Sequence, residues 1–399
     1  MDGKRLIERI RLTNFLTFGS EGVEIALEPL NVLIGPNLSG KSNFLEAISL
    51  LEALPQAAIR SSGGMSEWLW KGGEPSPVAE VASTIAYPDG PESLRHRFCF
   101  SALKERLVLV DESISTIPRP GIEPEYFYRF ETGLGLIEIS SPAAFGTPDA
   151  QRTHEMLPPE SIRTNQSILH QLRDPIRYPE LTYLASQFAQ IGLYVEGWSR
   201  EASKPPRIPV AADEPEDYLL ESGSNLALVL NNLFTSPARK ADLLGRLKRF
   251  NERIEDISLR VRGGVVGIEF YERGLNGPVS ARHISDGTLR FLMLLAILDH
   301  PSPPPLVCIE EPEHGLHPDA LHLVADLLRD ASQRCQLIVT THSDILVSAL
   351  SDLPEAIIVC ERDDAGTHLR RLEGAHLTDW LEKYTLGELW QMGEIGGRQ

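Results

Sequence analysis

The stretch GPNLSGKS at residues 35–42 constrains the fold of this chain more than any other. It matches the pattern G-x-x-x-x-G-K-S/T in full, and it lies between the apolar run LNVLI and the amphipathic run KSNFLEAISLLEAL. Glycines let the backbone curl so that its N–H groups converge, and a helix starting at the lysine points its positive end at the same place. The stretch therefore predicts a strand, a phosphate-binding loop (P-loop) and a helix.

The P-loop predicts a role for each of its key residues. Gly35 and Gly40 allow the curl of the backbone. Lys41 supplies a positive charge to the β and γ phosphates of a nucleotide, and Ser42 offers its hydroxyl to Mg²⁺. The predicted nucleotide-binding residues are Gly35, Pro36, Asn37, Ser39, Gly40, Lys41, Ser42 and Asn43.

A second motif, LVCIEEPEHGLHPDA at 306–320, places three glutamates and two histidines after an apolar run. Taken alone, it is compatible with a metal site, a pair of acid/base carboxylates or one part of a nucleotide site. A zinc site needs three or four ligands at set spacing, and His314 and His317 have no obvious third partner. With a P-loop in the same chain, we interpret the run as the metal-side strand of a nucleotide site.

In this interpretation, Glu310 holds Mg²⁺ through water and Glu311 polarises the attacking water. Glu313 is expected to be a solvated or hydrogen-bonded neighbour and not a catalyst. The run LIVTTHSDIL at 337–346 ends a strand with His342, which can bond a γ-phosphate oxygen or the attacking water. We predict Glu311 and His342 as catalytic residues, and Ser42 and Glu310 as the residues at the metal.

The stretch HISDGTLRFLMLLAIL at 283–298 predicts an apolar helix with Ser285 as its N-cap. The cap and the following glycine leave backbone N–H groups at the positive end of the helix, which makes a second phosphate-binding surface. The residues predicted to form this surface are Ser285, Asp286, Gly287 and Thr288.

The pattern along the chain predicts three parts. Short strands at 5–35 and alternating runs at 78–140 indicate an antiparallel sheet in an N-terminal half, 1–154. Residues 155–256 change to a helical pattern and are expected to form an insert. From 257 onward strands and helices alternate, which indicates a parallel sheet with helices on its faces in a C-terminal half, 257–399.

Composition excludes several classes of protein. The net charge of −18 excludes a wholly basic nucleic-acid-binding surface. The longest apolar run, FLMLLAIL, is too short to span a bilayer, and the charged N-terminus is unlike a signal peptide. The four cysteines are scattered, as expected of free thiols in a reducing compartment. We therefore expect a cytoplasmic protein without a membrane partner.

Together these motifs resemble the ATPase head of the ABC class, within its RecF/SMC/OLD branch. The resemblance rests on the opening run IERIRLTNFLTFG, Lys41, Ser285-Asp286-Gly287, Glu310-Glu311, GLHP at 315–318 and His342. The chain is especially similar to the bacterial stand-alone ATPases grouped with OLD-like proteins, which end in a segment similar to YTLGELWQMGEIGG at 384–397. This resemblance implies an α/β fold: a P-loop NTPase core sheet and an antiparallel β subdomain, with a helical insert between the two halves.

The resemblance also implies ATP and Mg²⁺ as cofactors and hydrolysis between two subunits. The P-loop of one subunit faces the signature helix, 285–288, of the other, which implies a homodimer or higher even oligomer. We expect no Toprim nuclease after His342, because strands, closing helices and a hairpin turn at Glu361, Asp363 and Asp364 occupy that segment.

A separately encoded effector, a nuclease or toxin in phage defence, is therefore the implied partner. A DNA-binding repair ATPase of RecF type and a low-turnover ATP-binding scaffold are alternatives. The long helical insert argues against a third alternative, a nucleotide-binding subunit of a transporter.

Four residues depart from the family pattern, one of them Asp344, which follows THS where proline is frequent. Leu38 stands where the P-loop usually has glycine, and Glu310 stands where other ABC heads have aspartate. Asp286 replaces a glycine of the signature and adds a negative charge where a γ-phosphate would dock. We therefore expect weaker closure around nucleotide, or an arginine or Mg²⁺ partner for Asp286.

The run RKADLLGRLKRFNERI at 239–254 gathers basic residues on a predicted helix. Helical spacing brings four of them to one face: Arg239, Arg246, Arg249 and Arg253. One interpretation is a solvated face with a few ion pairs. The other is a helix that contacts DNA phosphates or an acidic effector.

Overall fold

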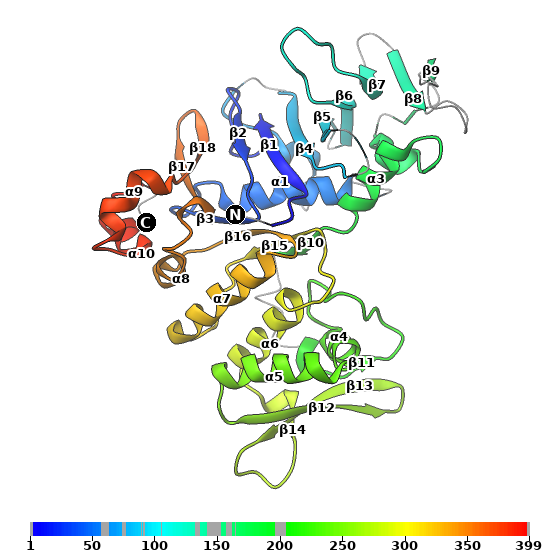
Figure 1. Ribbon diagram of the computed structural model, residues 1–399. Coiled ribbons are helices and arrows are strands. Elements are labelled where there is room, and N and C mark those ends of the chain that lie inside the picture. Colours follow the sequence, from blue (N-terminus) through cyan, green and yellow to red (C-terminus); the bar gives the residue numbers. More distant parts are fainter. Residues whose placement is uncertain are drawn as a thin grey trace. The chain divides into compact units, whose positions relative to one another are not determined.

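A computed structural model describes residues 3–396 apart from 57–63, 74–76, 89, 91, 105, 132–135, 142–152, 157–161, 164 and 196–204. The chain packs into two compact units, which we name by their motifs. The P-loop unit comprises Arg5–Ile191, Ile357–Leu372 and Ile395–Gln399, and the signature unit comprises Met1–Lys4, Gly192–Ala356 and Glu373–Glu394. Helices and strands are mixed in both, so the fold is α/β as expected (Figure 1).

The P-loop unit contains an antiparallel sheet in the order β2-β1-β4-β5-β6-β7-β8-β9. Alternating burial along β6 shows why this segment is a strand: one face packs on the core and the other meets solvent. This sheet confirms the one expected from residues 78–140. Its strands are β1 (Ile7–Thr13), β2 (Val23–Ala26), β4 (Ala79–Ile85), β5 (Leu94–Leu103), β6 (Arg106–Thr116), β7 (Tyr126–Glu131), β8 (Leu136–Ser141) and β9 (Thr153–Met156).

The P-loop unit also contains a parallel pair, β3 (Leu30–Ile34) and β17 (Ile357–Asp363), and β18 (Gly366–Arg371) runs antiparallel to β17. Every residue of β3 is buried, as its continuous apolar run requires. The turn between β17 and β18 confirms the expected hairpin. A hydrogen bond from His368, together with hydrogen bonds from the N–H groups of the turn, lowers the pKa of Asp363.

The described residues of the P-loop unit form the α-helices α1 (Lys41–Ala53), α2 (Ile168–Gln171) and α3 (Pro179–Phe188). The start of α2 is anchored on the sheet by Glu112, whose side chain is fully buried. Its carboxylate accepts hydrogen bonds from the Ser167 hydroxyl at 2.5 Å and the Ile168 N–H at 2.8 Å. These two bonds join strand β6 to the helical segment that follows the sheet.

The signature unit contains the parallel strands β10 (Gly192–Tyr194), β15 (Leu306–Glu310) and β16 (Gln336–Thr340) in that order. A second sheet in this unit is antiparallel and pairs β13 (Val265–Glu272) with three other strands. These strands are β11 (Val210–Ala211), β12 (Ile254–Arg262) and β14 (Val279–Ser280). The expectation of a parallel sheet from residue 257 onward was therefore wrong for 257–280. The glycine-containing turn between β12 and β13 makes a hairpin before the alternation of strands and helices begins.

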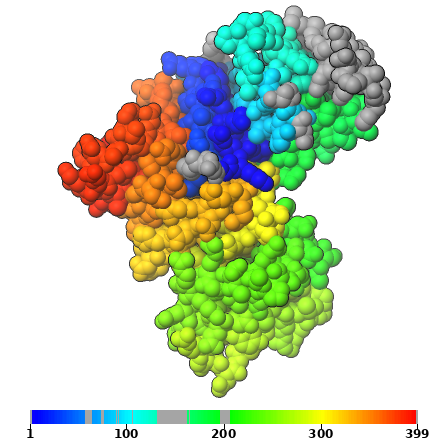
Figure 2. All heavy atoms as spheres, in the orientation of Figure 1, coloured from blue at the N-terminus to red at the C-terminus, as the bar shows by residue number. Residues whose placement is uncertain are grey.

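Helix burial in the signature unit follows sequence pattern. Helix α6 is apolar on all sides and is buried from Thr288 to its end, whereas α7 alternates buried and exposed faces. Helix α9 has no buried residue, and the C-terminal segment lies at the surface in Figure 2. The helices are α4 (Leu226–Leu233), α5 (Pro237–Phe250), α6 (Asp286–Leu298), α7 (Leu321–Ser332), α8 (Asp344–Ala349), α9 (Gly374–Leu381) and α10 (Leu386–Met392). Within the described ranges, no helix is long and apolar enough to cross a membrane.

The division into two halves and an insert at 155–256 stays a prediction. The described part of 155–256 holds α2 and α3 in the P-loop unit and α4 and α5 in the signature unit. Compact packing thus separates the chain at Ile191 and Gly192, inside the expected insert.

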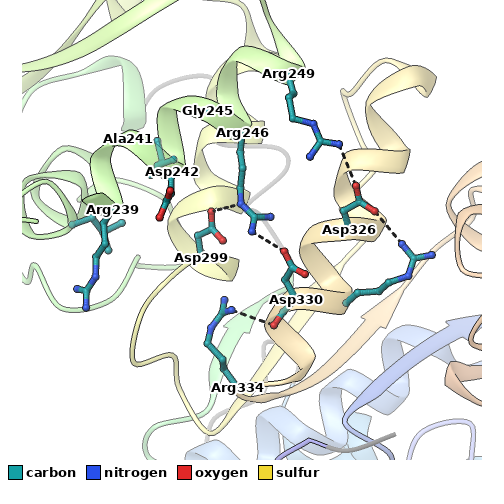
Figure 3. A pocket seen from close by; sticks show the side chains of 13 residues that line it. Arg239, Ala241, Asp242, Gly245, Arg246, Arg249, Asp299, Asp326, Asp330 and Arg334 are labelled. Carbon is teal, nitrogen blue, oxygen red and sulfur yellow. Dashed lines mark hydrogen bonds and ion pairs between the residues drawn. The ribbon is translucent and has the colours of Figure 1, made fainter. Parts of the chain in front are cut away.

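The basic residues on helix α5 are largely paired with acids. Arg246 bonds Asp299 and Asp330, and Arg249 bonds Asp326, which lies on α7 with Asp330 (Figure 3). The helix ends at Phe250, so Arg253 lies outside it and does not share the expected helical face. These pairs match the interpretation of a solvated face with ion pairs, and they join α5 to α7 beside a cavity of about 700 Å³.

We expect the double substitution Arg246→Glu/Arg249→Glu to destabilise the fold without changing DNA affinity. Each new carboxylate would face an aspartate, so the free energy of unfolding should fall by about 1 kcal/mol or more. Chemical denaturation measures the first effect, and DNA binding at low and high salt measures the second.

The matched control is Arg262→Glu/Arg273→Glu, which changes the net charge equally at two exposed arginines outside the basic run. Weaker DNA binding with a shallower salt dependence in Arg246→Glu/Arg249→Glu alone would contradict this prediction, because it would show that the helix contacts phosphates.

Candidate functional site

The P-loop connects β3 to α1 through two glycines whose backbone conformations disfavour any side chain. Gly35 has φ +147° and Gly40 has φ +105°, values that side-chain-bearing residues rarely adopt. A Cβ atom on Gly35 would collide with the carbonyl oxygen of Cys360, and one on Gly40 with the hydroxyl of Thr367. The predicted curl is therefore present, and the β17–β18 hairpin packs directly against it.

Lys41 is the first residue of α1, and its ammonium group contacts the backbone of the P-loop. Its Nζ donates to the carbonyl oxygens of Gly35 at 2.8 Å and Pro36 at 2.9 Å, and the residue is only 6% exposed. These bonds keep the cation beside the convergent loop and restrict its long side chain. The arrangement fits a group that neutralises phosphate charge.

The P-loop also fits a phosphate by its hydroxyl groups. The Ser39 hydroxyl is out of solvent and has no hydrogen-bond partner among the described residues. A buried hydroxyl without a partner costs stability, and a phosphate oxygen would accept a hydrogen bond from it. Asn43, by contrast, donates its side-chain amide to the Thr17 hydroxyl, which also accepts a bond from Thr367. Asn43 thus supports the loop from outside.

Leu38 lies at the apex of the loop with φ +66° and is 85% exposed. A glycine would adopt this conformation without strain, whereas leucine is strained there. The expectation of a stiffer loop therefore has a structural basis: the backbone conformation is retained and the residue lacks the freedom of glycine.

In the signature unit, the carboxylates follow β15 as the sequence predicts. Glu310 is the last residue of the strand, and Glu311 has φ +46°, a left-handed conformation that is uncommon outside glycine. The Glu311 N–H donates to the Thr340 carbonyl on β16 at 3.0 Å. The strained backbone turns the chain at the strand end, and such strain is often found at functional sites.

His342 lies beside Glu311, as the catalytic assignment requires. The His342 Nε2 atom is 3.6 Å from Oε1 of Glu311, and both side chains are partly exposed. An imidazole at this distance can orient the carboxylate or share a water with it. The structure therefore brings together the two predicted catalytic residues.

Glu313 has a role that sequence reasoning left open. Its Oε1 atom accepts hydrogen bonds from the Thr341 hydroxyl at 2.7 Å and from the His342 N–H at 2.8 Å. Burial raises its pKa, and these two bonds oppose the shift. Of the two expected states, solvated or hydrogen-bonded, the structure shows the hydrogen-bonded one: Glu313 fixes the backbone of His342.

The zinc alternative finds no support. His314 and His317 are 58% and 76% exposed. Across the residues that the structure describes, no three His, Cys, Asp or Glu side chains are grouped as metal ligands would be.

The signature forms the capped start of α6. Ser285 is the N-cap, as predicted: its hydroxyl accepts from the Thr288 N–H at 3.2 Å and bonds the Thr288 hydroxyl at 2.8 Å. Asp286 remains 76% exposed at the positive end of the helix and forms an ion pair with Arg207. The expected arginine partner for Asp286 is therefore present. Sequence reasoning missed Arg207 itself, because nothing in its Pro-rich surroundings signals this contact.

Comparisons with known proteins agree with this geometry. Residues 30–348 match the family described as "AAA domain, putative AbiEii toxin, Type IV TA system". A search among curated proteins returned no match.

The chain is also similar to solved structures. The chain is similar to an Smc head bound to the C-winged helix domain of ScpA, at 17% identity and a TM-score of 0.55, over 93% of this chain and 99% of that one. The Smc head domain with an extended coiled coil bound to the C-terminal domain of ScpA from Pyrococcus furiosus matches at 16% identity and a TM-score of 0.49, over 95% and 99%. The SMC head domain from Thermotoga maritima matches at 14% and 0.44, over 92% and 100%.

The fold is thus that of an Smc head. Because the family match spans most of the chain, the protein belongs to the AAA-domain family described as putative AbiEii toxin, Type IV TA system, and it is an ATP-binding ATPase.

Proposed function

We propose that this ATPase is a cytoplasmic switch of the OLD-like group. Two copies close head to tail around two ATP–Mg²⁺, and closure regulates a separately encoded effector, a nuclease or toxin, in phage defence. The family description names a putative toxin of a Type IV TA system, and the Smc head with the same fold is bound to a domain of a second protein. Both descriptions support a partnership between this ATPase and another chain.

The capped start of α6 carries the proposal. Ser285 and Asp286 are exposed, whereas the helix is buried from Thr288 onward. The Ser285 hydroxyl accepts from the Thr288 N–H, the first N–H groups of the helix have no backbone partner within it, and the helix dipole adds a partial positive charge at this end. An exposed positive helix end suits the terminal phosphate of an ATP held by another copy.

The remaining site residues take the roles that their chemistry suggests. Lys41 and the P-loop N–H groups bind the phosphates of ATP, and Mg²⁺ is held by Ser42 and, through water, by Glu310. Glu311 accepts a proton from the attacking water. His342, held by Glu313, orients that water or contacts the γ-phosphate.

Leu38 and Asp286 favour one alternative within this proposal, a scaffold that binds ATP and turns it over slowly. Leu38 strains the P-loop backbone, and Asp286 places a carboxylate at the helix end that receives phosphate. Steady-state turnover distinguishes a fast switch from such a scaffold.

Glu311→Gln should lower kcat by about 100-fold or more while ATP binding is retained, because the amide cannot accept the proton of water. The same variant should accumulate as an ATP-bound dimer. Turnover in wild type should rise with protein concentration, since the site is shared. Phosphate release and fluorescent-nucleotide binding measure these effects.

Glu214→Gln, an exposed glutamate of the same unit, is the control and should match wild type. Lys41→Ala should lower nucleotide affinity, whereas Glu311→Gln should lower kcat and retain affinity. Equal turnover in wild type and Glu311→Gln would rule out the catalytic assignment.

Ser285→Arg should leave ATP binding to the monomer intact and abolish ATP-dependent dimerisation, because its long side chain fills the phosphate-facing helix end. Light scattering with Glu311→Gln as background measures dimerisation. Ser302→Arg, at an exposed serine beyond the other end of α6, is the matched control. Unchanged closure in Ser285→Arg would show that the dimer does not use this surface.

Glu313→Ala should lower kcat by about tenfold with ATP affinity unchanged, because the His342 N–H and Thr341 hydroxyl lose their shared acceptor. Glu313→Gln keeps a carbonyl acceptor and should stay near wild type. Steady-state kinetics of the two variants decide between a positioning role for Glu313 and none.

Glu313 should also make the free energy of unfolding depend on pH. The pKa of Glu313 is raised in the folded state, so folding favours its protonated carboxyl. The contribution of this carboxyl to the free energy of unfolding is therefore complete below its unfolded pKa and is lost as pH rises through its folded pKa. Denaturation midpoints of wild type should therefore decline relative to Glu313→Gln over this range. Parallel pH profiles for the two proteins would contradict the expectation.

A further inference from the structure

Arg207 reaches from a short 3-10 turn, Pro205–Arg207, to the loop that precedes α6. Its Nη1 atom donates to three backbone carbonyl oxygens: Ile284 at 2.5 Å, Arg282 at 3.1 Å and Ala281 at 3.3 Å. The side chain is only 18% exposed. Three carbonyl groups converging on one guanidinium nitrogen fix the path of the chain into Ser285.

The other end of the same guanidinium, Nη2, forms an ion pair with the carboxylate of Asp286. Asp286 is the first residue of α6, so its charge lies where the helix dipole is positive. In the absence of nucleotide this placement is favourable. It becomes unfavourable when a phosphate approaches the same helix end, because two negative groups then compete for it.

The fork geometry of arginine accounts for the residue type. A planar guanidinium donates in two directions at once, here to carbonyl groups and to a carboxylate, whereas an ammonium is a single point charge. Arg207 therefore combines two tasks: it shapes the loop before the signature and it cancels the charge that Asp286 adds.

We propose that Arg207 is a positioning residue for ATP-driven closure. It holds the loop from Ala281 to Ser285 and neutralises Asp286, so that the start of α6 can receive the terminal phosphate of ATP bound to a second copy. The inference rests on the proposed function, because it takes the signature as the surface that meets ATP in the other subunit. Arg207 acts through Ser285 and Asp286 and does not itself touch the reacting atoms.

The test measures ATP-dependent dimerisation of the full chain in the Glu311→Gln background. Arg207→Ala should weaken dimerisation by about tenfold or more, as loss of charge-assisted hydrogen bonds does, while ATP affinity of the monomer stays unchanged. Arg262→Ala, at an exposed arginine of β12 in the same unit, is the matched control and should dimerise normally.

A second substitution in the Arg207→Ala background distinguishes neutralisation of Asp286 from a purely structural role of Arg207. Asp286→Asn should restore part of the dimerisation lost in the Arg207→Ala background, because the carboxylate that opposes phosphate is then absent. The carbonyl contacts stay lost in this double variant, so a role limited to bracing the loop predicts no recovery. Arg207→Gln with and without Asp286→Asn repeats the comparison if Arg207→Ala lowers the Tm below the assay temperature.

Normal dimerisation of Arg207→Ala, or failure of Asp286→Asn to restore any of the lost dimerisation, would overturn the inference. Ser285→Arg in the same background is the reference for the proposed function. If Ser285→Arg dimerises normally, the proposed function fails. If Ser285→Arg blocks closure and Arg207→Ala does not weaken it, the inference about Arg207 fails and the proposed function stands.

Discussion

The P-loop keeps its shape because two glycines lie in direct contact with the β17–β18 hairpin. Side chains at Gly35 or Gly40 would collide with Cys360 or Thr367, residues more than three hundred positions away. The curl in turn allows Lys41 to bond two loop carbonyls and leaves the Ser39 hydroxyl buried without a partner among the described residues. The phosphate-binding chemistry thus depends on close packing between the beginning and the end of the chain.

In the signature unit, hydrogen bonds and an ion pair stabilise negatively charged side chains. Glu313 is drawn out of solvent and holds the backbone of His342, which keeps the imidazole within 3.6 Å of Glu311. At the start of α6, Arg207 balances Asp286. Hydrogen-bond donors thus compensate the burial of Glu313 and the negative charge of Asp286. With both carboxylates compensated, the acidic chain is compatible with an anionic ligand.

Local pattern predicted much of the fold. The runs at 5–35 and 78–140 form the expected strands, because alternation of apolar and polar residues directly reflects burial of one sheet face. The same pattern failed at 257–280, where consecutive strands pair as a hairpin, since alternation does not say which strand is the neighbour. The basic run at 239–254 was predicted as one helix with a basic face. The helix ends at Phe250, and Asp299 after α6 and two aspartates on α7 neutralise Arg246 and Arg249.

The sequence by itself determined the P-loop, the Ser285 cap and the carboxylates after β15, because each of these features needs only neighbouring residues in one local backbone conformation. Tertiary structure decided the contacts between distant residues. Arg207 meets Asp286 across 79 positions, and Arg246 meets Asp330 across 84. Such pairs leave no local signal, since their geometry exists only after separate strands and helices have packed. For this reason the chemistry of the site was visible in the sequence, whereas the residues that position it were not.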